Sequence, residues 1–400
     1  MGQKGSIYVA RHVEELPPSG IRAFFDLVLG MKDVISLGVG EPDFTTPWNI
    51  REHAIYSLEQ GLTSYTSNKG TPELRKDIVK FLAWRRGLVY DWDTEMLITV
   101  GASEGMDLAF RAILNPGEKV LVHEPCFVAY APLVKLAGGE PVPLVTTEAD
   151  GFKVTPRKLE AAYVKGTKAL LLNYPCNPTG VSYTRAELLD IAAFARKRDL
   201  LVISDEIYDE LTYDFEHTPL ATLLGMKERV IYLNGFSKAY AMTGFRLGWV
   251  SGPAEILAAM TKIHQYTIMC APITSQMAAR EAIRNGMKDV QVMKREYNRR
   301  RNFIVSSLNE LGLDCHMPQG AFYAFPSIRR LGMSSIDFAK DLLDKEKVAL
   351  VPGNAFGSQC ADHVRISYAS SYDNLREAVA RIGKYLEARR KQGLRGHIGA

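Results

Sequence analysis

The sequence from Met96 to Val250 alternates short apolar runs with amphipathic stretches. This alternation is typical of parallel strands joined by helices, because each helix carries the chain back across the sheet before the next strand begins. The predicted strands are the segments MLITV, KVLVHE, ALLLNY, LVISDE, VIYLNGFS and LGWVSG. We therefore expect an α/β fold with a mostly parallel central sheet between helices.

A second group of elements follows Pro253. Its predicted elements are a charged bridging helix at 290–311, the strands AFYAFPSI, VALVPG and VRISYA, and helices near 335–345 and 373–392. A chain of 400 residues also exceeds the usual size of one domain. We expect a large domain at 45–290 and a smaller α+β domain made of 1–44 and 291–400.

Charge and cysteine content exclude several classes of protein. The formal net charge is only +4, and the basic residues interleave with acidic ones, so we expect no nucleic-acid partner. The five cysteines contain no C-x-x-C pair, which fits reduced thiols in the cytoplasm. No segment approaches the roughly 18 uninterrupted apolar residues of a membrane span, so we expect no membrane partner.

One lysine, Lys238, stands directly after a predicted strand, in the segment FSKAYAMTGFRLGW. Alone, it is most simply interpreted as a solvated surface lysine. Burial or nearby cations can, however, lower the pKa of a lysine, and the free amine then reacts with an aldehyde. Arg246 follows in the same segment and offers a fork of donors for a phosphate. Three interpretations of the segment therefore remain: it carries a covalent catalytic residue, it binds a phosphate, or it is an ordinary surface loop.

Other polar residues also follow predicted strands. Asp205 and Tyr208 follow LVIS, where an aspartate could hold a protonated pyridine nitrogen. Asn177 lies in the turn CNPTG, while Ser103 and Glu104 open a helix whose free N–H groups suit a phosphate. Helix caps and turn chemistry explain each motif equally well in isolation. Because ligands of α/β sheets bind at the carboxyl ends of strands, we expect these residues to converge on one cleft.

Arg365, in HVRISYA, is either a carboxylate-binding residue or half of a surface ion pair. In their order along the chain, however, these motifs resemble those of the class I aminotransferases, which are pyridoxal-phosphate enzymes of fold type I, the aspartate aminotransferase fold. The resemblance runs from SLGVGEPDFTTP and SYTSNKGTPELR through NPTG, SDEIY and FSKAYAMTGFRLGW to PQGAFYAFPSI and VRISYA. It therefore covers nearly the whole chain and implies pyridoxal 5′-phosphate as the cofactor.

The resemblance implies roles for residues around the cofactor ring. Lys238 binds the cofactor aldehyde covalently and, once displaced by the substrate amine, moves a proton between the substrate α-carbon and the cofactor. Asp205 pairs with the pyridine nitrogen, and Tyr208 and Asn177 hydrogen-bond the phenolic oxygen. The ring of Phe127 stacks on the cofactor.

The resemblance also implies how the phosphate and the substrate are bound. The expected phosphate-binding residues are Ala102, Ser103, Glu104, Ser237 and Arg246, with Glu104 acting through its backbone N–H rather than its carboxylate. Tyr65 reaches the cofactor of the neighbouring subunit, which implies a homodimer with shared sites. The expected substrate-binding residues are Gly40, Asn177 and Arg365. Of these, Arg365 grips the α-carboxylate while the smaller domain closes.

The implied activity is transfer of an amino group from an L-amino acid to a 2-oxo acid in a ping-pong cycle, with glutamate and 2-oxoglutarate as one pair. The segment 264–276 has no arginine for a second substrate carboxylate, so strict aspartate specificity is not expected. Together with SGIRAFFDLV, it most resembles the branch with N-acetyl-diaminopimelate, aspartate and aromatic aminotransferases. The alternatives are a β/γ-elimination lyase, which would release pyruvate and ammonia, and a cofactor-binding regulatory module, which lacks a basic helix-turn-helix region here.

Overall fold

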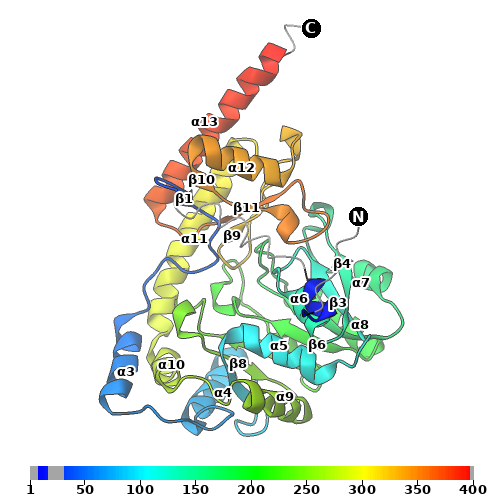
Figure 1. The fold of residues 1–400 in the computed structure, drawn as a ribbon, viewed down its shortest axis with the longest axis vertical. Coiled ribbons are helices and arrows are strands. Elements are labelled where there is room, and N and C mark those ends of the chain that lie inside the picture. The colour runs from blue at the N-terminus through cyan, green and yellow to red at the C-terminus, as the bar shows by residue number, and fades with distance from the viewer. Residues whose placement is uncertain (1–7, 17–30, 397–400) are drawn as a thin grey trace.

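The computed structural model describes residues 8–16 and 31–396. Its largest sheet, which lies in the lower part of Figure 1, has the order β2-β8-β7-β6-β5-β3-β4. The strands are β2 (Met96–Thr99), β3 (Lys119–Glu124), β4 (Glu140–Val145), β5 (Thr167–Asn173), β6 (Leu201–Asp205), β7 (Val230–Gly235) and β8 (Gly248–Ser251). Only β8 pairs antiparallel, with β2 and β7, whereas the other neighbours pair parallel. The predicted α/β class with a mostly parallel sheet is confirmed.

Two strands differ from the sequence-based expectation. β4 was not predicted, since Pro141 and Pro143 interrupt its apolar pattern. Proline is tolerated there because β4 is an edge strand, where one side of the backbone needs no partner. β8 was expected to be parallel, but only the short 3-10 helix η4 (Thr243–Phe245) lies in its connection to β7. A parallel connection usually needs a longer crossover, so the chain turns back antiparallel.

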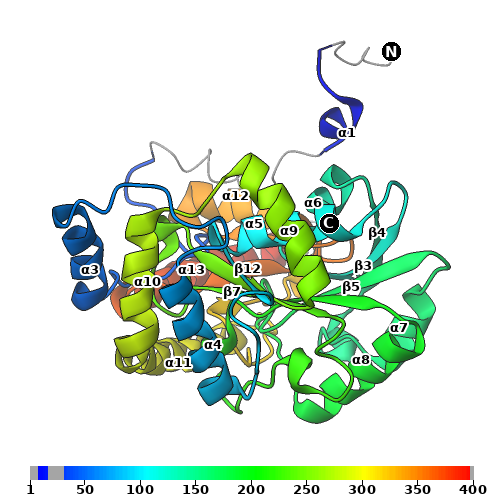
Figure 2. The ribbon, with the colours of Figure 1, turned by 90° about the horizontal axis from the view of Figure 1, so that it is seen from below.

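Helices cover both faces of this sheet, because alternate strand residues point to opposite sides (Figure 2). In β5, Leu170 and Leu172 join one core, whereas Ala169 and Leu171 join the other. The first core includes α4 (Pro72–Arg86), α8 (Arg185–Lys197) and α10 (Ile273–Asn285). The second includes α5 (Gly101–Ile113), α6 (Tyr130–Leu136) and α9 (Ala254–Thr267). Further helices are α3 (Trp48–Glu59), which packs on α10, and α7 (Pro156–Ala162), which lies beside β4.

A third core is built mainly from the last part of the chain and Leu37. Its helices are α11 (Met287–Glu310), α12 (Ser335–Glu346) and α13 (Tyr372–Gly396), which lie together in the upper part of Figure 1. Its strands are β9 (Tyr323–Ala324), β11 (Val351–Pro352) and β12 (Val364–Ser367) in one sheet, with β1 (Ile35–Ser36) paired to β10 (Val348–Ala349) in another. VALVPG, predicted as one strand, is thus divided between two sheets.

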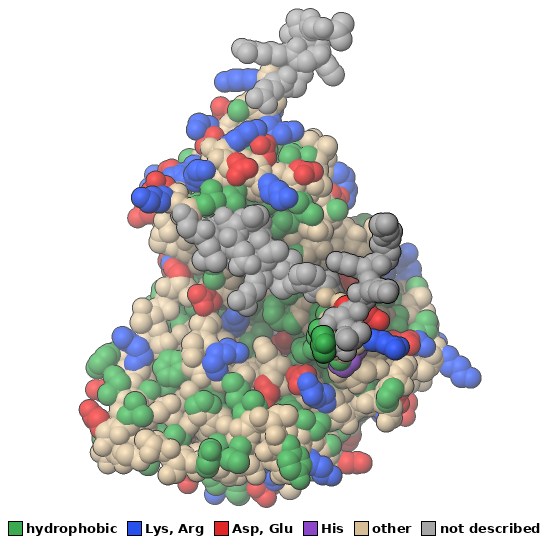
Figure 3. All heavy atoms as spheres, in the orientation of Figure 1, with side chains coloured by type: hydrophobic (Ala, Val, Ile, Leu, Met, Phe, Trp, Pro, Cys, Tyr) green, Lys and Arg blue, Asp and Glu red, His purple; other side chains and the backbone are tan. Residues whose placement is uncertain are grey.

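The remaining elements are short. They are α1 (Arg11–Glu14), which lies beside α6, and the 3-10 helices η1 (Glu148–Asp150), η2 (Asp209–Leu211), η3 (Leu220–Thr222), η5 (Arg329–Leu331) and η6 (Gly353–Ala355). The segment SGIRAFFDLV lies outside the described residues. On the face shown in Figure 3, acidic and basic side chains are intermixed. Within the described ranges, no helix is long and apolar enough to span a membrane.

Candidate active site

A cavity of about 540 Å³ lies where the carboxyl ends of β5 and β6 and the segment after β7 meet the start of α5. The predicted residues that line it are Gly40, Ala102, Ser103, Phe127, Asn177, Asp205, Tyr208, Ser237, Lys238, Arg246 and Arg365. Glu104 and Tyr65 are not among its lining residues. The fold therefore brings together residues that are up to 325 positions apart (365 − 40).

Lys238 is partly buried in the segment after β7 and projects into this cavity. Its Nζ donates a hydrogen bond to the backbone oxygen of Gly40, at 2.6 Å. The same nitrogen lies 5.8 Å from the ring centroid of Tyr208 and 5.9 Å from that of Phe322. No carboxylate pairs with Lys238 anywhere in residues 8–16 or 31–396. The ammonium is therefore not neutralised by an ion pair.

The surroundings of Lys238 lower its pKa to about 8. Burial is the largest cause, and the positive charges of Arg365 and Arg246 act in the same direction. The charges of Glu41 and Asp205 oppose them only in part. With a pKa of about 8, roughly a tenth of Lys238 is free amine at pH 7, and this fraction is the nucleophile that an aldehyde requires.

Asp205 ends β6 with a buried carboxylate. Oδ2 accepts a hydrogen bond from the Tyr130 hydroxyl at 2.7 Å, and Oδ1 accepts one from the Ile207 N–H at 3.2 Å. Burial raises the pKa of Asp205, although these two hydrogen bonds oppose the shift. Tyr130 was missed by sequence reasoning, yet it lies three residues after Phe127 and packs edge-on against that ring, at 5.7 Å. This spacing was the one available signal.

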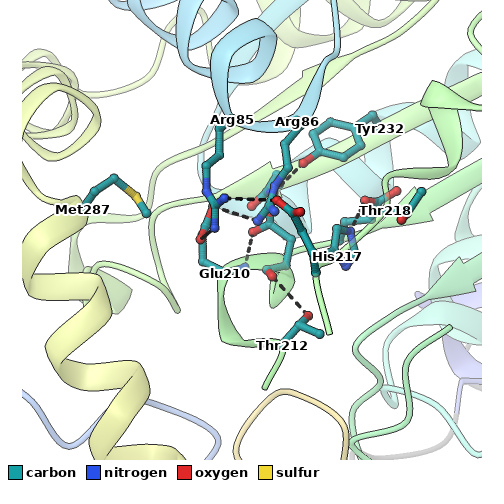
Figure 4. A network of polar contacts seen from close by, with 12 residues as sticks. Arg85, Arg86, Glu210, Thr212, His217, Thr218, Tyr232 and Met287 are labelled. Atoms are coloured by element: carbon teal, nitrogen blue, oxygen red, sulfur yellow. Dashed lines mark hydrogen bonds and ion pairs between the residues drawn. The ribbon is translucent and has the colours of Figure 1, made fainter. Parts of the chain in front are cut away.

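The segment after Asp205 is fixed to the end of α4 by buried ion pairs. Arg86 donates to Asp209 at 3.1 Å and to Glu210 at 2.7 Å. Arg85 grips both oxygens of Glu210, at 3.0 and 2.9 Å, and Figure 4 shows both guanidinium groups reaching toward this acid. Because an unpaired buried charge is costly, removing one partner of such a pair typically destabilises a protein by about 3–5 kcal/mol.

A second buried group of contacts fixes the same segment at Glu206. The Glu206 carboxylate accepts hydrogen bonds from the hydroxyls of Tyr174 and Ser204, at 2.9 and 2.6 Å. It also lies 2.5 Å from Nε2 of His217. The segment that carries Asp205 and Tyr208 is thus held at Glu206, Asp209 and Glu210, while Asp205 and Tyr208 themselves line the cavity.

The start of α5 and Arg246 together present hydrogen-bond donors and positive charge to one part of the cavity. Ala102 and Ser103 line the cavity in the first turn, where backbone N–H groups have no intrahelical acceptor. Gly101 precedes them with φ +75°, and a Cβ at this position would lie 2.8 Å from Nη2 of Arg246. Arg246 donates to the Thr243 backbone oxygen, at 3.1 Å, and has no ion pair within the described part of the chain. Its charge is available to an anion.

Arg365 is buried in β12, on the opposite wall of the cavity. It donates from Nη2 to the Gly38 backbone oxygen at 2.5 Å and from Nη1 to Asn177 Oδ1 at 2.8 Å. Its guanidinium lies 4.6 and 4.9 Å from the ring centroids of Tyr323 and Phe356. Across the described residues it has no carboxylate partner, and its Nε has no hydrogen-bond acceptor. A buried cation of this kind suits a site for an anion.

Two predicted residues lie elsewhere. The Glu104 carboxylate accepts a hydrogen bond from the Val100 N–H at 2.5 Å and lies 2.6 Å from Nδ1 of His264, outside the cavity. Tyr65 is 81% exposed, in the connection between α3 and α4. The structure of one chain therefore brings neither side chain to the other predicted residues.

Pyridoxal phosphate fits the groups that line the cavity. Its aldehyde matches the free amine of Lys238, and its ring nitrogen matches the buried acid Asp205. Its phosphate matches the α5 start and Arg246, which present donors and positive charge without a carboxylate partner. The buried guanidinium of Arg365 is not needed for these contacts, so it is available to bind a second anionic group.

Comparisons with known proteins agree with this geometry. The family described as Aminotransferase class I and II matches residues 32–382. An aminotransferase of Bacillus subtilis strain 168, YugH, is 56% identical over 95% of this chain and 98% of its own length. The aspartate aminotransferase of Pyrococcus abyssi is 46% identical over 93% and 97%, respectively. The crystal structure of an aromatic aminotransferase from Pyrococcus horikoshii OT3 is 43% identical, with a TM-score of 0.88 over 92% of this chain and 99% of that one.

All three relatives are named as aminotransferases, which favours amino-group transfer over the elimination catalysed by a lyase. The matched region includes both the residues around Lys238 and the strand that carries Arg365. The chain belongs to the class I and II aminotransferases, the enzymes that move an amino group from an amino acid to a 2-oxo acid with pyridoxal phosphate as cofactor.

Proposed function

We propose that the cavity binds the cofactor and an L-amino acid between Lys238 and Arg365. The observation that carries this proposal is the buried guanidinium of Arg365, which has no carboxylate partner across the described residues. An amino-acid substrate supplies that carboxylate. Arg365 then fixes the carboxylate end, so the Cα–H bond is oriented in relation to Lys238.

When bound, pyridoxal phosphate supplies an aldehyde and a ring that withdraws the electron pair of the substrate Cα–H bond. The Lys238 amine accepts the α-proton and returns it, because its lowered pKa allows both steps near neutral pH. Asp205 holds a proton at the ring nitrogen, while the Tyr130 hydroxyl fixes its carboxylate. Tyr208 and Asn177 line the same cavity and would hydrogen-bond the phenolic oxygen of the bound cofactor, and Phe127 would stack on its ring.

We assign the phosphate to the backbone N–H groups of Ala102, Ser103 and Glu104, the hydroxyl of Ser237 and the guanidinium of Arg246. Ser237 and Arg246 line the same cavity as the α5 start. The helix dipole and the charge of Arg246 both favour a dianion there.

For the second substrate pair we propose L-glutamate and 2-oxoglutarate. Lys238, Arg246 and Arg365 are the Lys and Arg side chains that line the cavity. All three are assigned to the cofactor or the α-carboxylate, so among the described residues no further lysine or arginine of the cavity wall is left to select a dicarboxylate. The names of the relatives, aspartate and aromatic aminotransferase, also differ in substrate. For the other pair we therefore assign a general L-amino acid as the donor.

We propose that residues 45–290 form a large domain and that 1–44 and 291–400 form a smaller one that closes over the substrate. Arg365 and Tyr323 come from the second part, whereas Lys238 comes from the first. Within 1–44, the segment from β1 pairs with β10, while α1 lies beside α6 of the large domain. All five cysteines are free, which supports a reducing, cytoplasmic location.

We further propose a homodimer in which Tyr65 reaches the phosphate of the neighbouring subunit. Its exposure and its position outside its own cavity support this assignment. The surrounding segment is held by hydrogen bonds from Gln276 Nε2 to Thr66, at 3.0 Å, and from Asn68 to the Met269 backbone oxygen, at 2.7 Å.

Sedimentation velocity tests the proposed dimer and should give the mass of two chains. A stable monomer with full activity would contradict the shared site.

Arg365→Lys tests the carboxylate assignment. Lysine keeps the positive charge but lacks the two parallel N–H donors with which a guanidinium binds both oxygens of a carboxylate. KM for L-glutamate should therefore rise by about a hundredfold. The visible absorbance of the lysine-bound cofactor should stay unchanged. Arg329→Lys is a matched control, because Arg329 is largely exposed and pairs with Asp362 at the surface. Unchanged substrate affinity in Arg365→Lys would remove the assignment.

The lowered pKa of Lys238 predicts how cofactor capture depends on pH. Below about pH 8 the ammonium form dominates, so the rate at which the cofactor-free protein binds pyridoxal phosphate covalently should rise as the pH passes through 8. Arg365→Met removes a positive charge and should shift this profile to higher pH, whereas Arg365→Lys should not. Stopped-flow absorbance measures the rate. A wild-type midpoint near the ordinary lysine pKa of about 10.4 would contradict the account.

A further inference from the structure

The position of Glu104 raises a problem for phosphate binding. This acid lies in the first turn of α5, whose free N–H groups face the cavity through Ala102 and Ser103. A carboxylate released toward the cavity would compete with the phosphate for those N–H groups, and its charge would repel a dianion. The chain must therefore keep this carboxylate away from the cavity.

The structure shows what occupies both oxygens of Glu104. Oε2 accepts the Val100 N–H at 2.5 Å, just before the helix begins. Oε1 lies 2.6 Å from Nδ1 of His264. The Glu104 side chain is 12% exposed and is not part of the cavity wall. The two contacts together hold the carboxylate on the outer side of the helix start.

His264 is unusual in its own surroundings. It lies on α9, which packs against α5, and its side chain is fully buried. Its Nε2 has no hydrogen-bond partner, so within the described ranges the one polar contact of the ring is with Glu104. Burying an imidazole with one unsatisfied nitrogen is costly. A polar ring at this buried position therefore needs a reason beyond packing.

We propose that His264 is a positioning residue for cofactor binding. It holds the Glu104 carboxylate against the Val100 N–H, which leaves the first-turn N–H groups of α5 free for the cofactor phosphate. The proposal rests on the assignment of the phosphate to α5. It also explains how an acid can stand in an anion-binding turn and still contribute through its backbone alone.

A purely structural role makes a different prediction. If His264 only stabilised the contact between α9 and α5, its loss would weaken the binding of any ligand that occupies the cavity. If it keeps Glu104 away, its loss should weaken phosphate-bearing ligands selectively. Pyridoxal phosphate and pyridoxal, which lacks the phosphate, separate the two roles in the same protein.

The experiment measures the dissociation constants of both ligands for the cofactor-free, full-length protein by absorbance titration. His264→Leu should weaken pyridoxal phosphate about tenfold more than pyridoxal, because the released carboxylate competes with the phosphate alone. His264→Asn is the matched control, because the asparagine amide nitrogen can take the place of Nδ1. In this variant the ratio of the two dissociation constants, pyridoxal over pyridoxal phosphate, should equal that of the wild type. His264→Leu combined with Glu104→Gln should restore the ratio, because no charge is then released. Thermal unfolding confirms that each variant folds.

Glu104→Gln alone keeps the test decisive if His264→Leu fails to fold. Because glutamine carries no charge, the variant should prefer pyridoxal phosphate over pyridoxal at least as strongly as the wild type does. A lower ratio in this variant would contradict the proposal, as would equal weakening of both ligands in His264→Leu. A wild-type protein that binds pyridoxal as tightly as pyridoxal phosphate would instead overturn the phosphate assignment itself.

Discussion

Arg365 places a positive charge in the wall of the cavity, and no carboxylate of the described residues pairs with it. Its two terminal nitrogens bind the Gly38 backbone oxygen and Asn177, so it joins the N-terminal segment to the turn after β5. Its field also helps to lower the pKa of Lys238. One buried guanidinium thus helps to lower the pKa of the amine across the cavity, and in the proposed function it also orients the substrate carboxylate.

The arrangement of charge around the cavity follows from this constraint. Cations face the positions proposed for anionic groups, and two acids nearby, Asp205 and Glu104, are buried with a partner or turned away from the cavity. Asp205 is buried with a raised pKa beside Tyr130, where a protonated ring nitrogen would pair with it. Glu104 is held outside by Val100 and His264. The placement of the acids is therefore as important to an anion-binding cavity as the placement of its cations.

Local sequence patterns predicted the elements that the hydrophobic core requires. Six strands of the large sheet were visible as apolar runs, because strands buried on both faces exclude polar residues. β4 was missed because two prolines at a sheet edge resemble a loop, and the direction of β8 was missed because an apolar run carries no sign of strand direction. Where the strands end, the order of polar residues predicted the cavity-lining residues.

What could not be predicted depends on contacts between distant segments. Arg85 and Arg86 end an amphipathic helix like many others, and only the fold brings them to Asp209 and Glu210, more than 120 positions away. His264 lies 160 positions from Glu104. The role proposed for Tyr65 involves a second chain, and a single sequence does not display such an interface. Residues that hold the site in place are thus harder to predict than residues that line it.

The measurement that tests the central claim most directly is the absorbance spectrum of the protein loaded with pyridoxal phosphate, before and after excess L-glutamate is added. If Lys238 carries the cofactor and Arg365 binds the substrate, the visible band of the lysine-bound cofactor should disappear. The absorbance of the aminated cofactor should replace it, with release of one equivalent of 2-oxoglutarate per site. A visible band that glutamate leaves unchanged, with no oxo acid released, would contradict glutamate-dependent amino transfer at this site.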